Sequence, residues 1–364
     1  MPHEADRAMY ARKPGWWMGA DGRSSDGKAI GFVKEEGFFT AREGLHALDP
    51  DSYGTRKGRV VVYVEDDDGN EIAVPFDNHA GIVDWDYNEQ VFRGLSIMAR
   101  DYGNVQLDEL FEMCDVIVGL IDGAHYEAAV KLRQGKQVVL TIYLGDYVLD
   151  PNGVADKGKR FLWAFNSWDG SWALRFKFGD FRIECANMAA MALRGSTDKG
   201  VVGSDWSTRH TTNIMERAAE AKSFLGLWSV HEKLYAAQAE HMIHTPLSSG
   251  AFDRIIGELY KTKDKTTGQM EPDEKVLTEV RVTRELSAAG RDIRDTVWGG
   301  FNAITEHHDW VTVPRGSAKT SVEEMRFVKQ LQDPTGLKQA AWDAFWDYAN
   351  DVNPTFKLPE LADA

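Results

Sequence analysis

The stretch FLWAFNSWDGSWALRFKF, from Phe161 to Phe178, decides the fold of this chain. At its centre lies Asp169-Gly170, a dipeptide that favours the tight turn of a β-hairpin. In the run after the turn, large apolar residues alternate with small or charged residues, as in a strand with one buried face. Arg175 and Lys177 fall on the opposite, polar face. The stretch therefore predicts an antiparallel hairpin that presents two cations to solvent.

The residues after this hairpin extend the same unit. A third strand is predicted over 181–185 with Arg182 on its polar side, so that Arg175, Lys177 and Arg182 would share one face. Residues 187–194 have the composition of a helix, and Asn187 is a suitable N-cap. The local order β-β-β-α predicts an antiparallel sheet backed by helices.

A second hairpin is predicted upstream. Two β-branched runs, 59–64 and 71–74, flank the turn-forming segment 65–70. This segment contains Asp66, Asp67 and Asp68, which suit a solvated turn better than a metal site, because three consecutive residues cannot all point at one ion.

Between the two hairpins, the pattern switches from helix to strand. Apolar residues at helical spacing predict a helix over 105–121, with Cys114 in its buried stripe. A second helix is predicted over 124–134, with Gly135 as its C-cap, and a strand follows over 137–144.

The second half of the chain is predicted to be helical. The expected helices cover 213–242, 251–260, 273–288, 295–306, 321–332 and 337–349, and the polar segment 261–272 is expected to be a mobile loop. The predicted fold class is therefore α+β, with an antiparallel sheet and helices in the N-terminal half and an all-helical C-terminal half. The expected division is an extended arm (1–30), an α+β core (31–210), a helical region (211–350) and a tail (351–364).

Composition excludes several classes of protein. The chain has 364 residues, a formal net charge of −15 and two cysteines, Cys114 and Cys185. No secretory signal, membrane span or disulfide framework is visible, so we expect a cytoplasmic protein, in a bacterial host cell. Segment 35–127 holds six basic and 21 acidic residues, whereas segment 128–222 holds 14 basic and 10 acidic residues. This asymmetry indicates either a face for a polyanion or a solvated surface of mixed sign.

Several separated motifs occur in the order seen in one known family. They are His3-Glu4 with Lys13-Pro14-Gly15-Trp16, then 166–171, 182–187, 209–211 and 301–306. In this respect the chain resembles the phage/plasmid-like proteins, a family built on a domain of unknown function and spread by lateral transfer. Trp168 stands where that family usually has a turn histidine, which weakens a catalytic or metal interpretation of the turn. The predicted hairpin and helices also resemble, in architecture only, the Redβ/RecT-type single-strand-annealing proteins.

The cations of the central segment form the first candidate site. Single-strand binding requires a cationic track with aromatic stacking platforms. Strand alternation favours burial of the aromatic side chains, which are Phe161, Trp163, Phe165 and Trp168. The candidate nucleic-acid-binding residues are Lys159, Arg160, Arg175, Lys177, Arg182, Arg194, Lys199, Arg209 and His210.

The other polar motifs have structural explanations. Asn166, Asp169, Gly170 and Asn187 are expected to hold a turn or cap a helix, although they could also form an active site. His241 and His244 near Glu240, and the cluster 306–309, match no metal-ligand motif, so no metal, cofactor or catalytic residue is expected.

The preferred functional hypothesis is a non-enzymatic protein of a phage or mobile element. It would bind and anneal single-stranded DNA in recombination or replication, and would form homo-oligomers. The alternative is an anti-defence interaction protein, whose acidic segment 35–127 mimics DNA and occupies a host nuclease or helicase. An enzyme with an unrecognised site around Arg209 and His210 is the third hypothesis.

Overall fold

A computed structural model describes most of the chain. The described residues are 5–10, 32–33, 38–87, 89–182, 188–189, 205–214, 216, 220, 228–264, 266–286, 292–312 and 336–358. The predicted helix over 321–332, the Trp16-Trp17 pair, and Asn187, Arg194 and Lys199 lie outside these residues.

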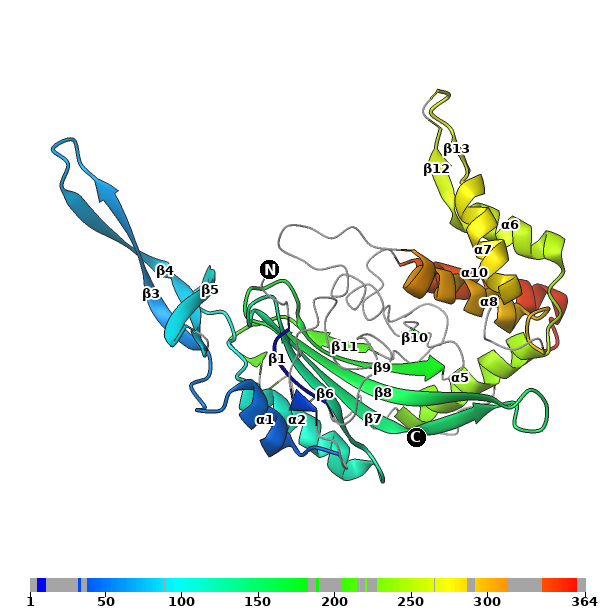
Figure 1. Cartoon of the computed structure of the whole chain (residues 1–364), viewed down its shortest axis with the longest axis horizontal. Coiled ribbons are helices and arrows are strands. Elements are labelled where there is room, and N and C mark those ends of the chain that lie inside the picture. Colours follow the sequence, from blue (N-terminus) through cyan, green and yellow to red (C-terminus); the bar gives the residue numbers. More distant parts are fainter. Residues whose placement is uncertain are drawn as a thin grey trace.

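An eight-stranded sheet forms the centre of the molecule (Figure 1). Its strands are β1 (Ala5–Tyr10), β2 (Phe32–Val33), β6 (His125–Leu132), β7 (Gln137–Leu149), β8 (Asp156–Ser167), β9 (Leu174–Arg182), β10 (Met188–Ala189) and β11 (Asp205–Thr208). The order is β10-β9-β8-β7-β6-β1-β2, and β11 also pairs with β9. All pairings are antiparallel except β1 with β2. Part of the expected arm, Ala5–Tyr10, is therefore a strand of this sheet.

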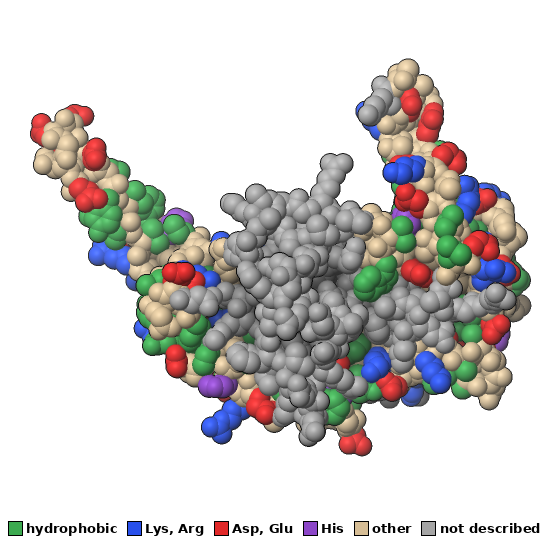
Figure 2. Space-filling view, viewed as in Figure 1, with side chains coloured by type: hydrophobic (Ala, Val, Ile, Leu, Met, Phe, Trp, Pro, Cys, Tyr) green, Lys and Arg blue, Asp and Glu red, His purple; other side chains and the backbone are tan. Residues whose placement is uncertain are grey.

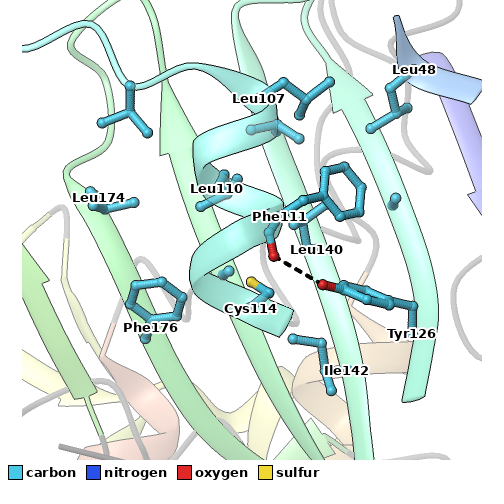
Figure 3. Close-up of a cluster of buried hydrophobic side chains, with 14 of the residues drawn as sticks. Leu48, Leu107, Leu110, Phe111, Cys114, Tyr126, Leu140, Ile142, Leu174 and Phe176 are labelled. Carbon is cyan, nitrogen blue, oxygen red and sulfur yellow. Dashed lines mark hydrogen bonds between the residues drawn. The ribbon is translucent and has the colours of Figure 1, made fainter. Parts of the chain in front are cut away.

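Two helices, α1 (Ala41–Leu48) and α2 (Leu107–Leu120), cover one face of the sheet. The buried stripe of α2 includes Leu110, Phe111 and Cys114, which lie over Leu140 and Ile142 of β7 and Phe176 of β9 (Figure 3). The hydroxyl of Tyr126 donates to the carbonyl oxygen of Phe111 at 3.2 Å and so joins the helix to the sheet. This is the first hydrophobic core.

A three-stranded sheet projects from this core. It consists of β3 (Arg56–Glu65), β4 (Glu71–Asp86) and β5 (Val91–Ala99), in that order. The distal parts of β3 and β4 form a two-stranded ribbon that extends away from the body (Figure 1). At its base Asp84, which is buried, accepts a hydrogen bond from Lys131 of β6 at 3.0 Å. Burial raises the pKa of Asp84 above its usual value, and Lys131 and Arg93 partly offset that shift.

The second hydrophobic core is largely helical. It contains α5 (Trp228–Ile243), α6 (Ser249–Leu259), α7 (Glu274–Leu286), α8 (Val297–Glu306) and α10 (Leu337–Val352). Tyr147 and Leu149, at the far end of β7, belong to this core as well. A five-residue π-helix, His307–Val311, follows α8, and its Asp309 forms a buried ion pair with Lys338 at 2.7 Å.

The predicted α+β class is confirmed, but the distribution of elements is only partly as expected. Helices α1 and α2 lie in the N-terminal half, and the C-terminal half contains the hairpin β12 (Lys261–Lys263) and β13 (Met270–Pro272). The expected mobile loop over 261–272 is therefore wrong. Asp264 organises this turn by accepting hydrogen bonds from the amides of Thr266 and Thr267.

Two predicted helices are also wrong. Residues 124–134 were favoured as helix by their alanines, glutamate and lysine, but they form β6, a central strand buried on both faces. Gly135 is not a helix cap, because Arg133, Gln134 and Gly135 all have positive φ in the tight turn to β7. Within the predicted helix 187–194, Met188–Ala189 forms β10 and pairs with β9.

Both predicted hairpins are confirmed, as are the predicted helix over 105–121, which is α2, and the strand over 137–144, which is part of β7. The hairpin around Asp169-Gly170 is β8–β9, and the hairpin around 65–70 is β3–β4. None of the helices in the described part of the chain has both the length and the apolar composition of a membrane span.

The Lys131–Asp84 pair leads to a prediction about stability. In Lys131→Met, Asp84 loses its nearest cation, so its pKa in the folded state rises further above its value in the unfolded chain. The ionised carboxylate is then penalised only in the folded state. The lost stability should therefore be small near the unfolded pKa and should grow with pH to about 3 kcal/mol. Chemical denaturation at about pH 5 and about pH 7.5 measures this difference.

The control is the double variant Asp84→Asn/Lys131→Met, which contains no carboxylate at this site. Its stability relative to the native chain should not fall as the pH rises over the same interval, because the raised pKa of Asp84 penalises the native chain but not the double variant. An equal loss at both pH values for Lys131→Met alone would contradict the argument.

Candidate nucleic-acid interface

The turn between β8 and β9 is held by the surrounding loops. Trp168 is fully buried, its indole N–H donates to the carbonyl oxygen of Val105 at 2.8 Å, and its amide donates to Lys136 at 2.8 Å. The hydroxyl of Tyr102 donates to the carbonyl oxygen of Ser167 at 2.8 Å. These contacts fix the turn against two neighbouring segments, the loop 102–105 and the β6–β7 turn at Lys136.

Side chains of the motif 166–171 hold the turn itself. Asp169 accepts hydrogen bonds from the amide of Ser171 at 3.0 Å and from its hydroxyl. Gly170 has φ +71°, and a Cβ there would lie 2.7 Å from Cε of Met98. The buried amide of Asn166 donates to Val105 at 3.4 Å. These three residues have direct structural roles.

A groove lies next to this turn, where β11 pairs with β9. Ser207 is directly opposite Arg175 in the register of the two strands. The groove has a volume of about 650 Å³ and is lined by Ala173, Ser207, Thr208, Arg209, Thr211, Thr212 and Asn213. Arg209 is exposed and Arg175 is half-buried. The described lining combines a guanidinium group with hydroxyl and amide groups and includes no carboxylate. We call this feature the Arg209 groove.

His210 fixes the position of the Arg209 groove on the body. Its ring stacks on Tyr102 with centroids 4.7 Å apart, and its Nδ1 donates to the carbonyl oxygen of Gly103 at 2.9 Å. The amide of Gly103 donates back to the carbonyl oxygen of His210 at 3.1 Å. Burial lowers the pKa of His210 below its usual value, so the ring is neutral at pH 7. His210 therefore anchors the strand and supplies no positive charge.

Two half-buried tryptophans, Trp172 and Trp206, are chain neighbours of residues that line the groove. Trp172 precedes the lining residue Ala173 and is half-buried. Its ring packs edge-on against Phe165 with centroids 5.7 Å apart. The four aromatic residues considered in the sequence analysis are buried, each less than 5% exposed. Trp172 therefore retains exposed surface next to the groove, as does Trp206, which precedes the lining residue Ser207 and packs against Phe176.

The predicted cationic face is not present as expected. Lys177 is fully buried and its ammonium group lies 5.6 Å from the ring centre of Trp163, because this face of the sheet is buried as well as the face under α2. Arg182 is not in a separate strand: β9 is continuous from Leu174 to Arg182, and Arg182 pairs with Gly158. This register gives no support for a single face shared by Arg175, Lys177 and Arg182.

Lys159 and Arg160 lie toward the other end of the β8–β9 pair. Lys159 is opposite Phe181, whereas Arg175 is opposite Phe165. The Lys159 ammonium lies 5.4 Å from the ring centre of Tyr143, and the Arg160 guanidinium lies 4.9 Å from that of Tyr147. Of the predicted binding residues whose side chains are described, Arg209 lines the groove, His210 follows it in the chain, and Arg175 lies opposite the lining residue Ser207.

The structure does not bring the histidine clusters together. His241 is buried and stacks on Phe356 at 3.9 Å, whereas His307 contacts Glu279 at 3.2 Å and Asp309 pairs with Lys338. Within the described residues, no three histidine, cysteine or acidic side chains are grouped as metal ligands. Burial also raises the pKa of the Cys114 thiol well above its usual value, which disfavours the reactive thiolate.

Comparison with known proteins places the chain in a family. The profile of a domain of unknown function, DUF932, matches residues 94–334, which is about two thirds of the chain. The chain belongs to the DUF932 family. No curated protein and no solved structure matches it. The match confirms membership of an uncharacterised domain family, the coarser part of the resemblance noted above.

The DUF932 match includes the turn, the Arg209 groove and the helices α5 to α8, and it begins after the β3–β4 ribbon. Sequence reasoning missed most of the lining of the groove, since Arg209 is the one lining residue among the candidate binding residues. The available signal was a run of hydroxyl and amide groups, Thr211, Thr212 and Asn213, that continues beyond Arg209.

The close contact at Gly103 provides a test of this part of the DUF932 domain. A Cβ at Gly103 would lie 2.2 Å from the carbonyl oxygen of Thr211 and 2.9 Å from Ile214. Gly103→Ala must therefore displace the segment that carries the groove, and we expect it to lower the free energy of unfolding by about 1–3 kcal/mol. Chemical denaturation measures the change.

Gly119→Ala is the matched control. Gly119 lies in α2, and no atom is within 4 Å of the position of its added Cβ. Alanine should leave the stability unchanged or raise it by about 0.5–1 kcal/mol. If both variants had the same stability, Gly103 would not be a close-contact site.

Proposed function

We propose that this protein binds single-stranded DNA through the Arg209 groove and acts without catalysis in recombination or replication of a phage or other mobile element. The observation that carries the proposal is exposed Arg209 in a groove whose described lining has hydroxyl and amide groups but no carboxylate, with Arg175 opposite the lining residue Ser207. The whole chain has a net charge of −15, whereas the described lining of this groove has one arginine and no acidic residue.

The groups in the groove suit a phosphodiester backbone. A guanidinium group offers planar, paired donors that match phosphate oxygens. Serine, threonine and asparagine side chains are common partners of phosphate and sugar groups in DNA complexes. Arg209 and Arg175 would neutralise phosphate charge, and Ser207 and Thr211 would orient the backbone.

Trp172 supports a preference for single strands. Base stacking on an aromatic side chain requires an unpaired, accessible base, and it contributes about 1–3 kcal/mol per stacked base. Trp172 lies at the end of the groove and keeps exposed surface, while its edge-on contact with Phe165 holds the ring. The arrangement favours one stacked base next to two phosphate contacts.

The resemblance to phage/plasmid-like proteins supports the biological setting of the proposal. It includes the motif 209–211, of which Arg209 and Thr211 line the groove, and the motif 166–171, which forms the turn between β8 and β9. A protein that binds single strands with little sequence preference would serve the pairing or protection of strands during recombination.

The first test concerns the two arginines. The double variant Arg175→Ala/Arg209→Ala should bind a labelled mixed-sequence single strand more weakly than the native chain. Loss of two phosphate contacts should reduce the slope of log affinity against log salt concentration by about 1.4. Fluorescence anisotropy at several salt concentrations measures both quantities.

The matched control is Lys263→Ala/Lys275→Ala. This variant also loses two exposed positive charges, but from β12 and α7, which lie outside the groove. Its affinity and salt slope should remain close to those of the native chain. Equal losses in both double variants would contradict a localised site, and absence of binding by the folded native chain at low salt would overturn the proposal.

The second test concerns Trp172. Trp172→Ala should reduce affinity for a single strand by about fivefold or more, because one stacking contact is lost. Affinity for a duplex of the same length should change little, since its bases are already stacked. An equal reduction for both DNAs would show that Trp172 does not contact bases.

A second candidate function is the anti-defence DNA mimic. The observation that favours it is the acidic tip of the β3–β4 ribbon, where Asp67 and Asp68 are exposed. Other acidic residues of segment 35–127 are buried, such as Asp49 and Asp84, so the segment is not one continuous anionic surface. This candidate predicts no DNA affinity, and copurification of a host nuclease or helicase that is lost when Asp67 and Asp68 are neutralised.

A further inference from the structure

The β3–β4 ribbon exposes an apolar face that nothing in the described chain covers. Val62 is directly opposite Val74, and Val64 is directly opposite Ile72, so the four side chains lie on one face of the ribbon. Each of them is between 40% and 47% exposed. Exposed apolar patches of this kind on folded proteins mark interaction surfaces. We call these four residues the ribbon face.

The ribbon has little support of its own. Between the tip and His79, β4 pairs only with β3, because its pairing with β5 is confined to residues 79–86. An isolated two-stranded ribbon is marginally stable in water. A second layer packed on the ribbon face would bury the exposed valines and stabilise the hairpin.

Charge is segregated along the ribbon. The tip carries five acidic residues, Glu65, Asp66, Asp67, Asp68 and Glu71. The base carries Arg56, Lys57 and Arg59, and of its carboxylates Asp77 is exposed, whereas Asp84 and Asp86 are less exposed and pair with Lys131 and Arg93. Figure 2 shows this order, with red side chains at the tip, green ones along the middle and blue ones toward the base. Arg59 and Asp77 are 3.9 Å apart and both largely exposed, so Arg59 remains accessible to a second carboxylate.

We propose that a second copy of this chain packs on the ribbon face, with the two ribbons antiparallel. In this arrangement the acidic tip of each ribbon lies beside the basic base of the other, and the two ribbon faces cover each other. A parallel arrangement would instead place the two acidic tips together, which is unfavourable. The two-fold symmetry is that of most homodimers, in which the same patch is used by both subunits.

The size of the ribbon face determines the expected affinity. Four half-exposed side chains offer much less than the ~800 Å² per partner of a standard interface. The dimer should therefore be weak and should depend on concentration, and its opposite charges should make it weaker at high salt. This inference concerns a different surface from the Arg209 groove and does not depend on DNA binding.

Sedimentation velocity over a wide range of protein concentrations tests the proposal. The native chain should convert from monomer to dimer as concentration rises. Val74→Glu should increase the dissociation constant at least about tenfold, since the charge enters the apolar contact from both copies. Ala73→Glu adds the same charge one residue earlier, on the opposite face of the ribbon, and should dimerise almost as well as the native chain. Both substitutions lie outside the two hydrophobic cores, so circular dichroism should show that both variants remain folded.

A charge exchange tests the antiparallel orientation. Asp67→Arg/Asp68→Arg and Arg59→Glu should each weaken the dimer, and a chain that carries all three changes should regain affinity because its tip and base again have opposite charges. A native chain that stays monomeric at every concentration would overturn the proposal and indicate a different partner for the ribbon. Equal effects of Val74→Glu and Ala73→Glu would overturn the assignment of the face, and failure of the triple variant to regain affinity would overturn the orientation.

Discussion

The structure depends on one long β-hairpin that belongs to two hydrophobic cores. At one end of β7 and β8, Val138 and Trp168 are buried under α2, and at the other end Tyr147 and Leu149 are buried among the helices. The indole N–H of Trp298 in α8 donates to the buried carboxylate of Asp156 at the start of β8, at 2.8 Å. Because a paired hairpin cannot bend freely between its ends, packing at each end fixes the helical region relative to the sheet.

This constraint explains which parts of the fold could be predicted. The two hairpins with strong turn signals, around Asp169-Gly170 and 65–70, are correct because the turn and the strands are encoded locally. The predicted helix over 124–134 is wrong because the composition of this segment favours a helix, whereas its place as a strand between β1 and β7 depends on pairing with distant residues. Tertiary context overrides local propensity most strongly in a central strand buried on both faces.

The candidate site, like the fold, could be predicted only in part from the sequence. Arg209 and Arg175 were identified from their sequence neighbourhood, and pairing of β11 with β9 places Arg175 opposite Ser207, two residues before Arg209. Lys177 was expected to be exposed because the alternation of apolar and polar residues assigns it to the polar face. Such alternation predicts exposure only where one face of the sheet is in contact with water. Here both faces are buried, so Lys177 lies against Trp163. Alternation places Trp172 on the same face as Leu174 and Phe176, but Trp172 lies outside β9, two residues before its first residue, and is only half-buried.

The distribution of charge connects the two proposed surfaces. The acidic excess of the chain arises in segment 35–127, and five of its carboxylates lie at the tip of a ribbon that projects from the body. Charges separated by more than about 10 Å in water at moderate salt interact weakly. Placing them on the ribbon therefore reduces their repulsion of an anionic ligand at the Arg209 groove. The same placement leaves the acidic tip accessible to the basic base of another ribbon, so a single segregation of charge suits the chain both to a polyanion and to a second copy of itself.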